Sequence, residues 1–152
     1  MQIEIVMEVK AMTIQTQALP NTRSKFLTTV LRSDGVFAVL SGTVAVLGAG
    51  PVAGLIGLDV PLALVLLGVV LLGYGGLLLF YASKEPANVR IAQVAIVLNI
   101  LWVLGSYLGL LLGWFPVNTA GKWTIALIAE VVFLFALLEI VALWRLRGGQ
   151  RK

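Results

Sequence analysis

The sequence predicts an all-α, antiparallel four-helix transmembrane bundle with both termini in the cytoplasm, and three observations support this prediction. Hydrophobic residues make up 60% of the 152-residue chain and charged residues only 12%, against roughly 25% charged residues in soluble domains. Four long stretches are nearly free of charge, and the basic residues gather on one side of them. A soluble domain of this size has too little interior to bury so much apolar surface.

Four membrane spans follow from the lengths of these stretches. A bilayer core about 30 Å thick needs about 20 helical residues to cross it, and continuous apolar runs without alternation argue against strands. The predicted helices cover about residues 31–50, 61–82, 89–113 and 121–145 of a transmembrane domain over 31–146. Short links make consecutive helices antiparallel neighbours. Pro51 interrupts the first stretch, so this helix either ends near Ala49, before a short re-entrant or interfacial segment, or continues with a kink.

The basic residues set the orientation. Ten of the eleven Lys and Arg residues lie before or at the entry to the first span, in the second link or after the last span, and only Lys122 falls on the other side. Basic residues favour the cytoplasmic side. Residues 1–30 are then a cytoplasmic segment, either disordered or interfacial, and residues 147–152 a basic cytoplasmic tail. Attraction of these residues to anionic lipid explains the basic pI without nucleic acid as a partner.

The chain contains neither Cys nor His. Disulfides, Cys/His metal sites and His-based catalysis are therefore excluded. No nucleophile–base set or metal-ligand cluster stands out, so we expect no enzyme activity, no cofactor and no metal.

One face of the third predicted helix carries its polar and small residues at spacings of three and four, namely Ala95, Asn99, Trp102, Ser106, Gly109 and Gly113. Membrane helices associate through small residues and interhelical hydrogen bonds. We therefore predict helix packing at Gly105, Gly109 and Gly113, and at Gly42 in the first helix. Asn99 either bonds a neighbouring helix or lines a substrate or proton path.

Glu130 and Glu139 are the acidic residues of the fourth predicted helix. A carboxylate at mid-membrane costs about 2.5–3.5 kcal/mol on insertion scales, and nine residues at 100° each place the two on opposite sides of the helix. Glu130 is predicted to lie level with Ser106 and about a turn from Trp102, which makes Glu130, Asn99, Trp102 and Ser106 candidates for a transport site. Glu139 is predicted to form an ion pair near the interface with Arg32 or Arg90, or to contact another protomer.

Asp34 follows Arg32 and Ser33 at the expected start of the first helix. Acidic residues are favoured at helix starts, where they accept hydrogen bonds from free N–H groups. We therefore predict a capping role for Asp34.

The segments "SDGVFAVLSG" and "VLNILWVLGS", together with the four short spans, resemble a group of small bacterial integral membrane proteins without assigned function. The resemblance covers about residues 31–145, with Asp34, Gly42, Asn99, Trp102 and Ser106 as landmarks. It implies a four-helix bundle and no particular activity. Small multidrug transporters are similar in size and span number, but their essential carboxylate lies within the first helix, where none is expected here.

Two functions are compatible with these features. The first is a non-enzymatic accessory or structural component of the lipid bilayer that packs with itself or with a larger membrane complex. The second is a small proton-coupled transporter or permease that uses Glu130. In either case we expect a multi-pass protein of the bacterial inner membrane or of another internal energy-transducing membrane.

Overall fold

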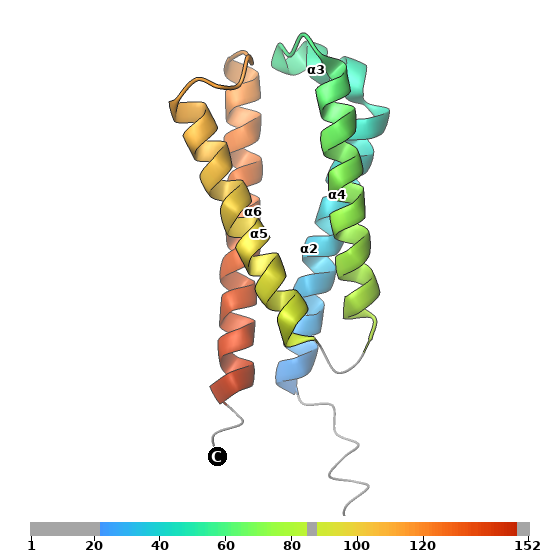
Figure 1. Cartoon of the computed structure of the whole chain (residues 1–152), viewed down its shortest axis with the longest axis vertical. Helices are drawn as coiled ribbons and strands as arrows, with labels where there is room; N and C mark the ends of the chain where they lie inside the picture. The colour runs from blue at the N-terminus through green and yellow to red at the C-terminus, as the bar shows by residue number, and fades with distance from the viewer. Residues whose placement is uncertain (1–21, 85–87, 149–152) are drawn as a thin grey trace, which may run out of the picture.

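The structure, a computed structural model, describes residues 22–84 and 88–148, and these residues form five helices and no strand (Figure 1). The helices, labelled as in Figure 1, are α2 (Thr22–Leu47), α3 (Ala49–Ile56), α4 (Pro61–Ala82), α5 (Val89–Leu111) and α6 (Thr119–Gly148). The four long helices are each long and apolar enough to cross a membrane. The prediction of an all-α protein with four helices that could span a membrane is confirmed for this part of the chain. Most of the predicted N-terminal segment and basic tail lies outside it.

The four long helices form two pairs. Helix α2 begins and α6 ends at one end of the molecule, where α4 also ends and α5 begins; α3 and the α5–α6 link lie at the opposite end (Figure 1). The most extensive contact joins α2 to α4, and the next joins α5 to α6. Contacts between α2 and α6 connect the pairs, whereas α4 and α5 barely touch. The bundle is thus held together mainly through α2 and α6.

Glycines bring α2 and α4 into close backbone contact. A Cβ added at Gly42 would lie 2.7 Å from the backbone oxygen of Gly68, and a Cβ at Gly68 would lie 2.7 Å from the oxygen of Gly42. Gly75 meets the backbone oxygen of Gly35 in the same way, at 2.6 Å. Close approach over small residues is the main source of helix association in lipid, where apolar surfaces gain nothing by leaving water.

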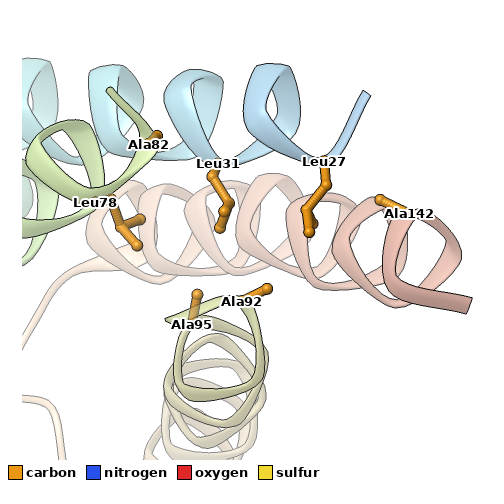
Figure 2. Close-up of a cluster of buried hydrophobic side chains, with 7 residues drawn as sticks. All are labelled: Leu27, Leu31, Leu78, Ala82, Ala92, Ala95 and Ala142. Atoms are coloured by element: carbon orange, nitrogen blue, oxygen red, sulfur yellow. The ribbon is translucent and has the colours of Figure 1, made fainter. Parts of the chain in front are cut away.

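A cluster of buried apolar side chains fills the bundle toward the end where α2 begins. It contains residues from all four long helices, and Figure 2 shows their side chains directed toward one another: Leu27, Leu31, Leu78, Ala82, Ala92, Ala95 and Ala142. We call this set the apolar cluster. Leucine side chains from α2 and α4 fill the space that the alanines of α5 and α6 leave open, as close-packed interiors require.

Helix α2 differs most from the sequence prediction. It begins at Thr22 and not near residue 31. The charged residues Lys25 and Arg32 do not end this helix, because it is longer than the bilayer core. At 1.5 Å per residue its 26 residues extend ~39 Å, against about 30 Å of hydrocarbon. It ends at Leu47, and Pro51 belongs to the separate helix α3. The interpretation that the first helix ends before Pro51 is confirmed, and the kinked continuous helix is wrong.

The remaining helix ends are fixed by local hydrogen bonds. The Asn88 side chain accepts from the Arg90 backbone N–H at 3.0 Å and caps α5, as its position before that helix suggests. Asn118 connects α3 to the start of α6: its Nδ2 donates to the Leu55 carbonyl at 3.0 Å, and its Oδ1 accepts from the Gly121 N–H at 2.9 Å. These bonds hold the two helix pairs together at the end opposite the apolar cluster.

Candidate functional site

Each of the four long helices contributes one side chain to a group of hydrogen-bonded polar residues inside the bundle. The group, which we call the polar cluster, consists of Asp34 on α2, Tyr74 on α4, Asn99 on α5 and Glu139 on α6. Asp34, Asn99 and Glu139 are 2%, 4% and 0% exposed, and Tyr74 is half-buried. Buried polar side chains in a membrane span are rare and are by default candidates for function.

Tyr74 and Asn99 occupy the middle of the polar cluster. The Tyr74 hydroxyl donates to Asp34 Oδ2 at 2.8 Å and lies 3.1 Å from Asn99 Oδ1. Asn99 Nδ2 donates one hydrogen to each acid, to Asp34 Oδ2 at 3.1 Å and to Glu139 Oε2 at 3.3 Å. One amide nitrogen thus bridges two carboxyl groups from different helices, and the amide oxygen lies beside the Tyr74 hydroxyl.

Asp34 and Glu139 form a carboxyl pair. Both accept a hydrogen bond from the same amide nitrogen of Asn99, at 3.1 and 3.3 Å. An ionised carboxylate only accepts hydrogen bonds, whereas a protonated one also donates. Glu139 Oε1 is buried and has no hydrogen-bond partner. The pair therefore has a place for a proton and a free acceptor atom, and it does not use its full hydrogen-bonding capacity.

The polar cluster lies within the apolar part of the four long helices, closer to the end where α2 begins. Tyr74 is eight residues from the end of α4 and Asn99 ten residues from the start of α5, which correspond to ~12 and ~15 Å at 1.5 Å per residue. Residues of the apolar cluster lie one and two turns away on the same helix faces, for example Leu31, Leu78 and Ala95. They separate the polar cluster from the aqueous phase at that end.

Trp102 and Ser106 follow Asn99 on the interior face of α5. Ser106 is 7% exposed, and the indole nitrogen of Trp102 is buried without a hydrogen-bond partner. Residues three and seven positions apart share a helix face, so the predicted stripe is the face that α5 turns inward: Ala95, Asn99, Ser106 and Gly109 are buried on it. The structure brings Asn99 to the acids of α2 and α6 and places Trp102 and Ser106 beyond it toward the α5–α6 link.

Glu130 does not join Asn99. It is exposed on the outer surface of α6, where it accepts a hydrogen bond from the Tyr107 hydroxyl of α5. The deduction that Glu130 and Glu139 point to opposite sides of the helix agrees with this, since Glu139 is buried and Glu130 is not. The structure thus does not bring Glu130 together with Asn99, Trp102 and Ser106, because the helix rotation that buries Glu139 turns Glu130 outward.

Two further predictions need correction. Asp34 does not cap a helix, because α2 starts twelve residues earlier and Asp34 lies inside the first span; the expectation that this span holds no carboxylate is therefore wrong. Glu139 is fully buried and bonds Asn99, whereas Arg32 and Arg90 are exposed. The ion pair predicted between Glu139 and these arginines is not formed, because the arginines lie on the outside of the bundle.

The predicted packing glycines behave differently from one another. Gly42 contacts α4 as described above. Gly109 lies against the ring of Phe115, its own neighbour in the α5–α6 link, and a Cβ at Gly105 or Gly113 would meet no atom within 4 Å. Gly113 follows the end of α5 with φ of 67°, a backbone conformation that favours glycine. Helix packing by Gly105 and Gly113 is thus not seen within the chain.

Two residues of the polar cluster were missed by reasoning from the sequence. Asp34 was predicted to lie at a helix end because the first helix was predicted to begin near residue 31, whereas α2 begins at Thr22. Tyr74 lies among Gly73, Gly75 and Gly76, and small residues of this kind indicate helix packing. The signal that identifies Tyr74 is its position: counted from the link at residues 83–88, Tyr74 and Asn99 fall at similar depth. Within residues 22–84 and 88–148, no group of three or more His, Cys, Asp and Glu residues could hold a metal.

The fold and this site together define a class, a small multi-pass α-helical membrane protein with a carboxyl pair buried among its spans. Comparison of the chain with protein-family models, with curated proteins and with solved structures gives no match. The function therefore has to be argued from the polar cluster itself.

Proposed function

We propose that this protein is a small proton-coupled carrier in which Asp34 and Glu139 form the proton-binding site. The observation that carries the proposal is the burial of two carboxyl groups from different spans that share one amide nitrogen as hydrogen-bond donor. Such a pair retains one proton between its two acids and can release it when a substrate or a conformational change separates them. Asn99 and Tyr74 hold the acids in place through the hydrogen bonds described above.

A purely structural role explains the polar cluster less well. Interhelical hydrogen bonds in membranes contribute about 0.6 kcal/mol each on average, while a charged residue at the bilayer centre costs about 2.5–3.5 kcal/mol. Serine or amide side chains would join the four helices without that cost. The buried Oε1 of Glu139, which has no partner, is also unexpected in a group selected for stability alone. A reversible proton-binding site accounts for both features.

The orientation of the carrier follows from its charges. We propose an antiparallel bundle with both termini in the cytoplasm, in the bacterial inner membrane or another internal energy-transducing membrane. Lys25, Lys84, Arg90 and Arg147 lie at or near the end where α2 begins, and Lys122 lies at the other; basic residues favour the cytoplasmic side. A membrane that maintains a proton gradient is where proton coupling has a driving force.

An accessory, non-enzymatic role in a membrane complex is the second candidate. It is favoured by the exposed Glu130–Tyr107 pair, because a polar group on the outer surface of a span suits contact with another polypeptide. Mild detergent extraction followed by native mass measurement separates the two candidates. Stable copurification of a different membrane protein supports the accessory role, and a particle made only of this chain supports the carrier.

Infrared spectroscopy of the reconstituted protein tests proton binding directly. We expect the carboxylic C=O stretch of a buried acid to change when the pH is varied, and Glu139→Gln or Asp34→Asn to remove that change. Glu130→Gln, the same substitution at an exposed acid of the same helix, should leave it in place. Retention of the band in both buried-site variants, with helix content unchanged, would rule out the carboxyl pair as the proton site.

A further inference from the structure

The surface formed by α5 and α6 carries a polar pair in apolar surroundings. Glu130 accepts a hydrogen bond from Tyr107 on the outside of the molecule. Leu127, one turn before Glu130, is 63% exposed, and Leu134, one turn after it, is 57% exposed. Glu130 is eleven residues from the start of α6, ~16 Å at 1.5 Å per residue. This pair therefore lies at a depth where lipid chains surround an isolated monomer.

A carboxyl group facing lipid chains is unfavourable unless it is neutral and its hydrogen bonds are satisfied. In its neutral form Glu130 has one donor and an acceptor oxygen, and the Tyr107 hydroxyl likewise has one donor and an acceptor oxygen. The bond from Tyr107 to Glu130 uses one donor and one acceptor. It leaves the Glu130 O–H without an acceptor and the Tyr107 oxygen without a donor. The surface of one copy thus has one hydrogen-bond donor and one acceptor without partners.

We propose that a second copy of this chain covers this surface. In a twofold dimer the Glu130 O–H of each copy donates to the Tyr107 oxygen of the other, so that four groups close a ring of four hydrogen bonds. Each copy has one unused donor and one unused acceptor, and the other copy supplies the matching acceptor and donor. This self-complementarity is the condition for an isologous interface. An axis along the membrane normal also places the two pairs at the same depth.

The positions beside Tyr107 on the same face of α5 support a helical occupant. Leu104 lies one turn before Tyr107 and Leu111 one turn after it, and they are 54% and 83% exposed. An apolar helix can pack against these leucines around the polar pair. The proposal is independent of the carboxyl pair of the polar cluster.

Cysteine cross-linking tests the surface, because the chain contains no native Cys. Leu104 lies one turn before Tyr107 and is 54% exposed, and Val70 on α4 is 66% exposed. In proteoliposomes under oxidation, Leu104→Cys should form a covalent dimer and Val70→Cys should not. A dimer through Val70→Cys alone, or none from either variant with a monomeric mass in bilayers, would overturn the proposal.

Substitutions of the polar pair test its chemistry. Glu130→Leu and Tyr107→Phe each remove part of the ring and should lower the dimerisation constant in bilayers about tenfold, as expected for the loss of two interhelical hydrogen bonds. Glu130→Gln keeps one donor side and one acceptor side and should retain the dimer. Equal dimerisation of all variants by single-molecule photobleaching, or a different protein bound to this surface in native extracts, would contradict it.

Discussion

At the scale of single residues, Asn99 is the side chain that connects the most elements. Its amide nitrogen reaches Asp34 and Glu139, and its amide oxygen faces the Tyr74 hydroxyl. Removing one partner from a buried network leaves the others unsatisfied, which costs more than the bond itself contributes. Without Asn99, Asp34 and Glu139 would each lose a hydrogen-bond donor while remaining buried. Asn99 is therefore both a structural bridge and the residue that positions the carboxyl pair.

Asn99→Ala should lower the free energy of unfolding by about 1–3 kcal/mol, because it leaves two buried carboxyl groups without a shared donor. Thermal unfolding in mild detergent measures the change. Gln93→Ala removes an exposed amide from the same helix and should change stability by less than about 0.5 kcal/mol. Equal destabilisation by both variants would show that Asn99 does not bridge the acids.

Helix periodicity predicts part of the polar cluster from the sequence. The inward stripe of α5, including Asn99 and Ser106, follows from spacing alone, and so does the opposition of Glu130 and Glu139. Which of the two acids faces inward does not follow, because it depends on how α6 rotates against α2 and α5. Asp34 and Tyr74 come close to Asn99 only through tertiary packing across 65 and 25 residues of sequence.

At the scale of helices, the contact between α2 and α4 depends on backbone atoms meeting without side chains between them. Gly42 and Gly68 each face the other's carbonyl oxygen, and Gly35 and Gly75 do the same one heptad away. A methyl group at Gly42, Gly68 or Gly75 would overlap a backbone atom that cannot move without moving its helix. The pair α2–α4 is therefore the more closely packed half of the bundle.

Gly42→Ala should destabilise the protein by about 1–3 kcal/mol, since it forces α2 and α4 apart. Gly73→Ala, at a position of α4 where a Cβ meets nothing within 4 Å, should be neutral or stabilising by up to about 1 kcal/mol through helix propensity. Unfolding in mild detergent compares the two. A stabilising Gly42→Ala would mean that α2 and α4 are not in close contact.

Helix boundaries show what the sequence can and cannot specify. The start of α4 at Pro61 and of α5 after Asn88 were predicted correctly, because a proline and a cap act within one turn. The start of α2 was missed by nine residues, since a charged residue near an interface can stand inside or outside a helix. α5 ends at Leu111, two residues earlier than predicted, and the chain turns at Gly113.

At the scale of the whole molecule, two helix pairs are joined at both ends by different means. The apolar cluster and the polar cluster join them toward the end where α2 begins, and Asn118 joins them at the other. The Asn118 backbone N–H also donates to the Ile56 carbonyl at 2.9 Å. Because α4 and α5 barely touch, a relative movement of the pairs has to break these few bonds first.

Asn118→Ala should release α3 from the start of α6 while leaving the polar cluster intact. Hydrogen exchange measured by mass spectrometry should then speed up in peptides covering residues 52–60 and 117–123, because local opening no longer breaks the two side-chain bonds. Peptides around Tyr74 and Asn99 should not change. Unchanged exchange near α3 would show that Asn118 contributes little to this end of the bundle.

The glycine contact between α2 and α4 also bears on how the chain enters the membrane. These two spans are synthesised before α5 and α6, and Tyr74 supplies a hydrogen-bond donor to Asp34 without help from the later spans. A hairpin of α2 and α4 can thus leave the insertion machinery as a preassembled unit with its acid already paired. Glu139 arrives last and meets a site that the first hairpin and Asn99 have already built.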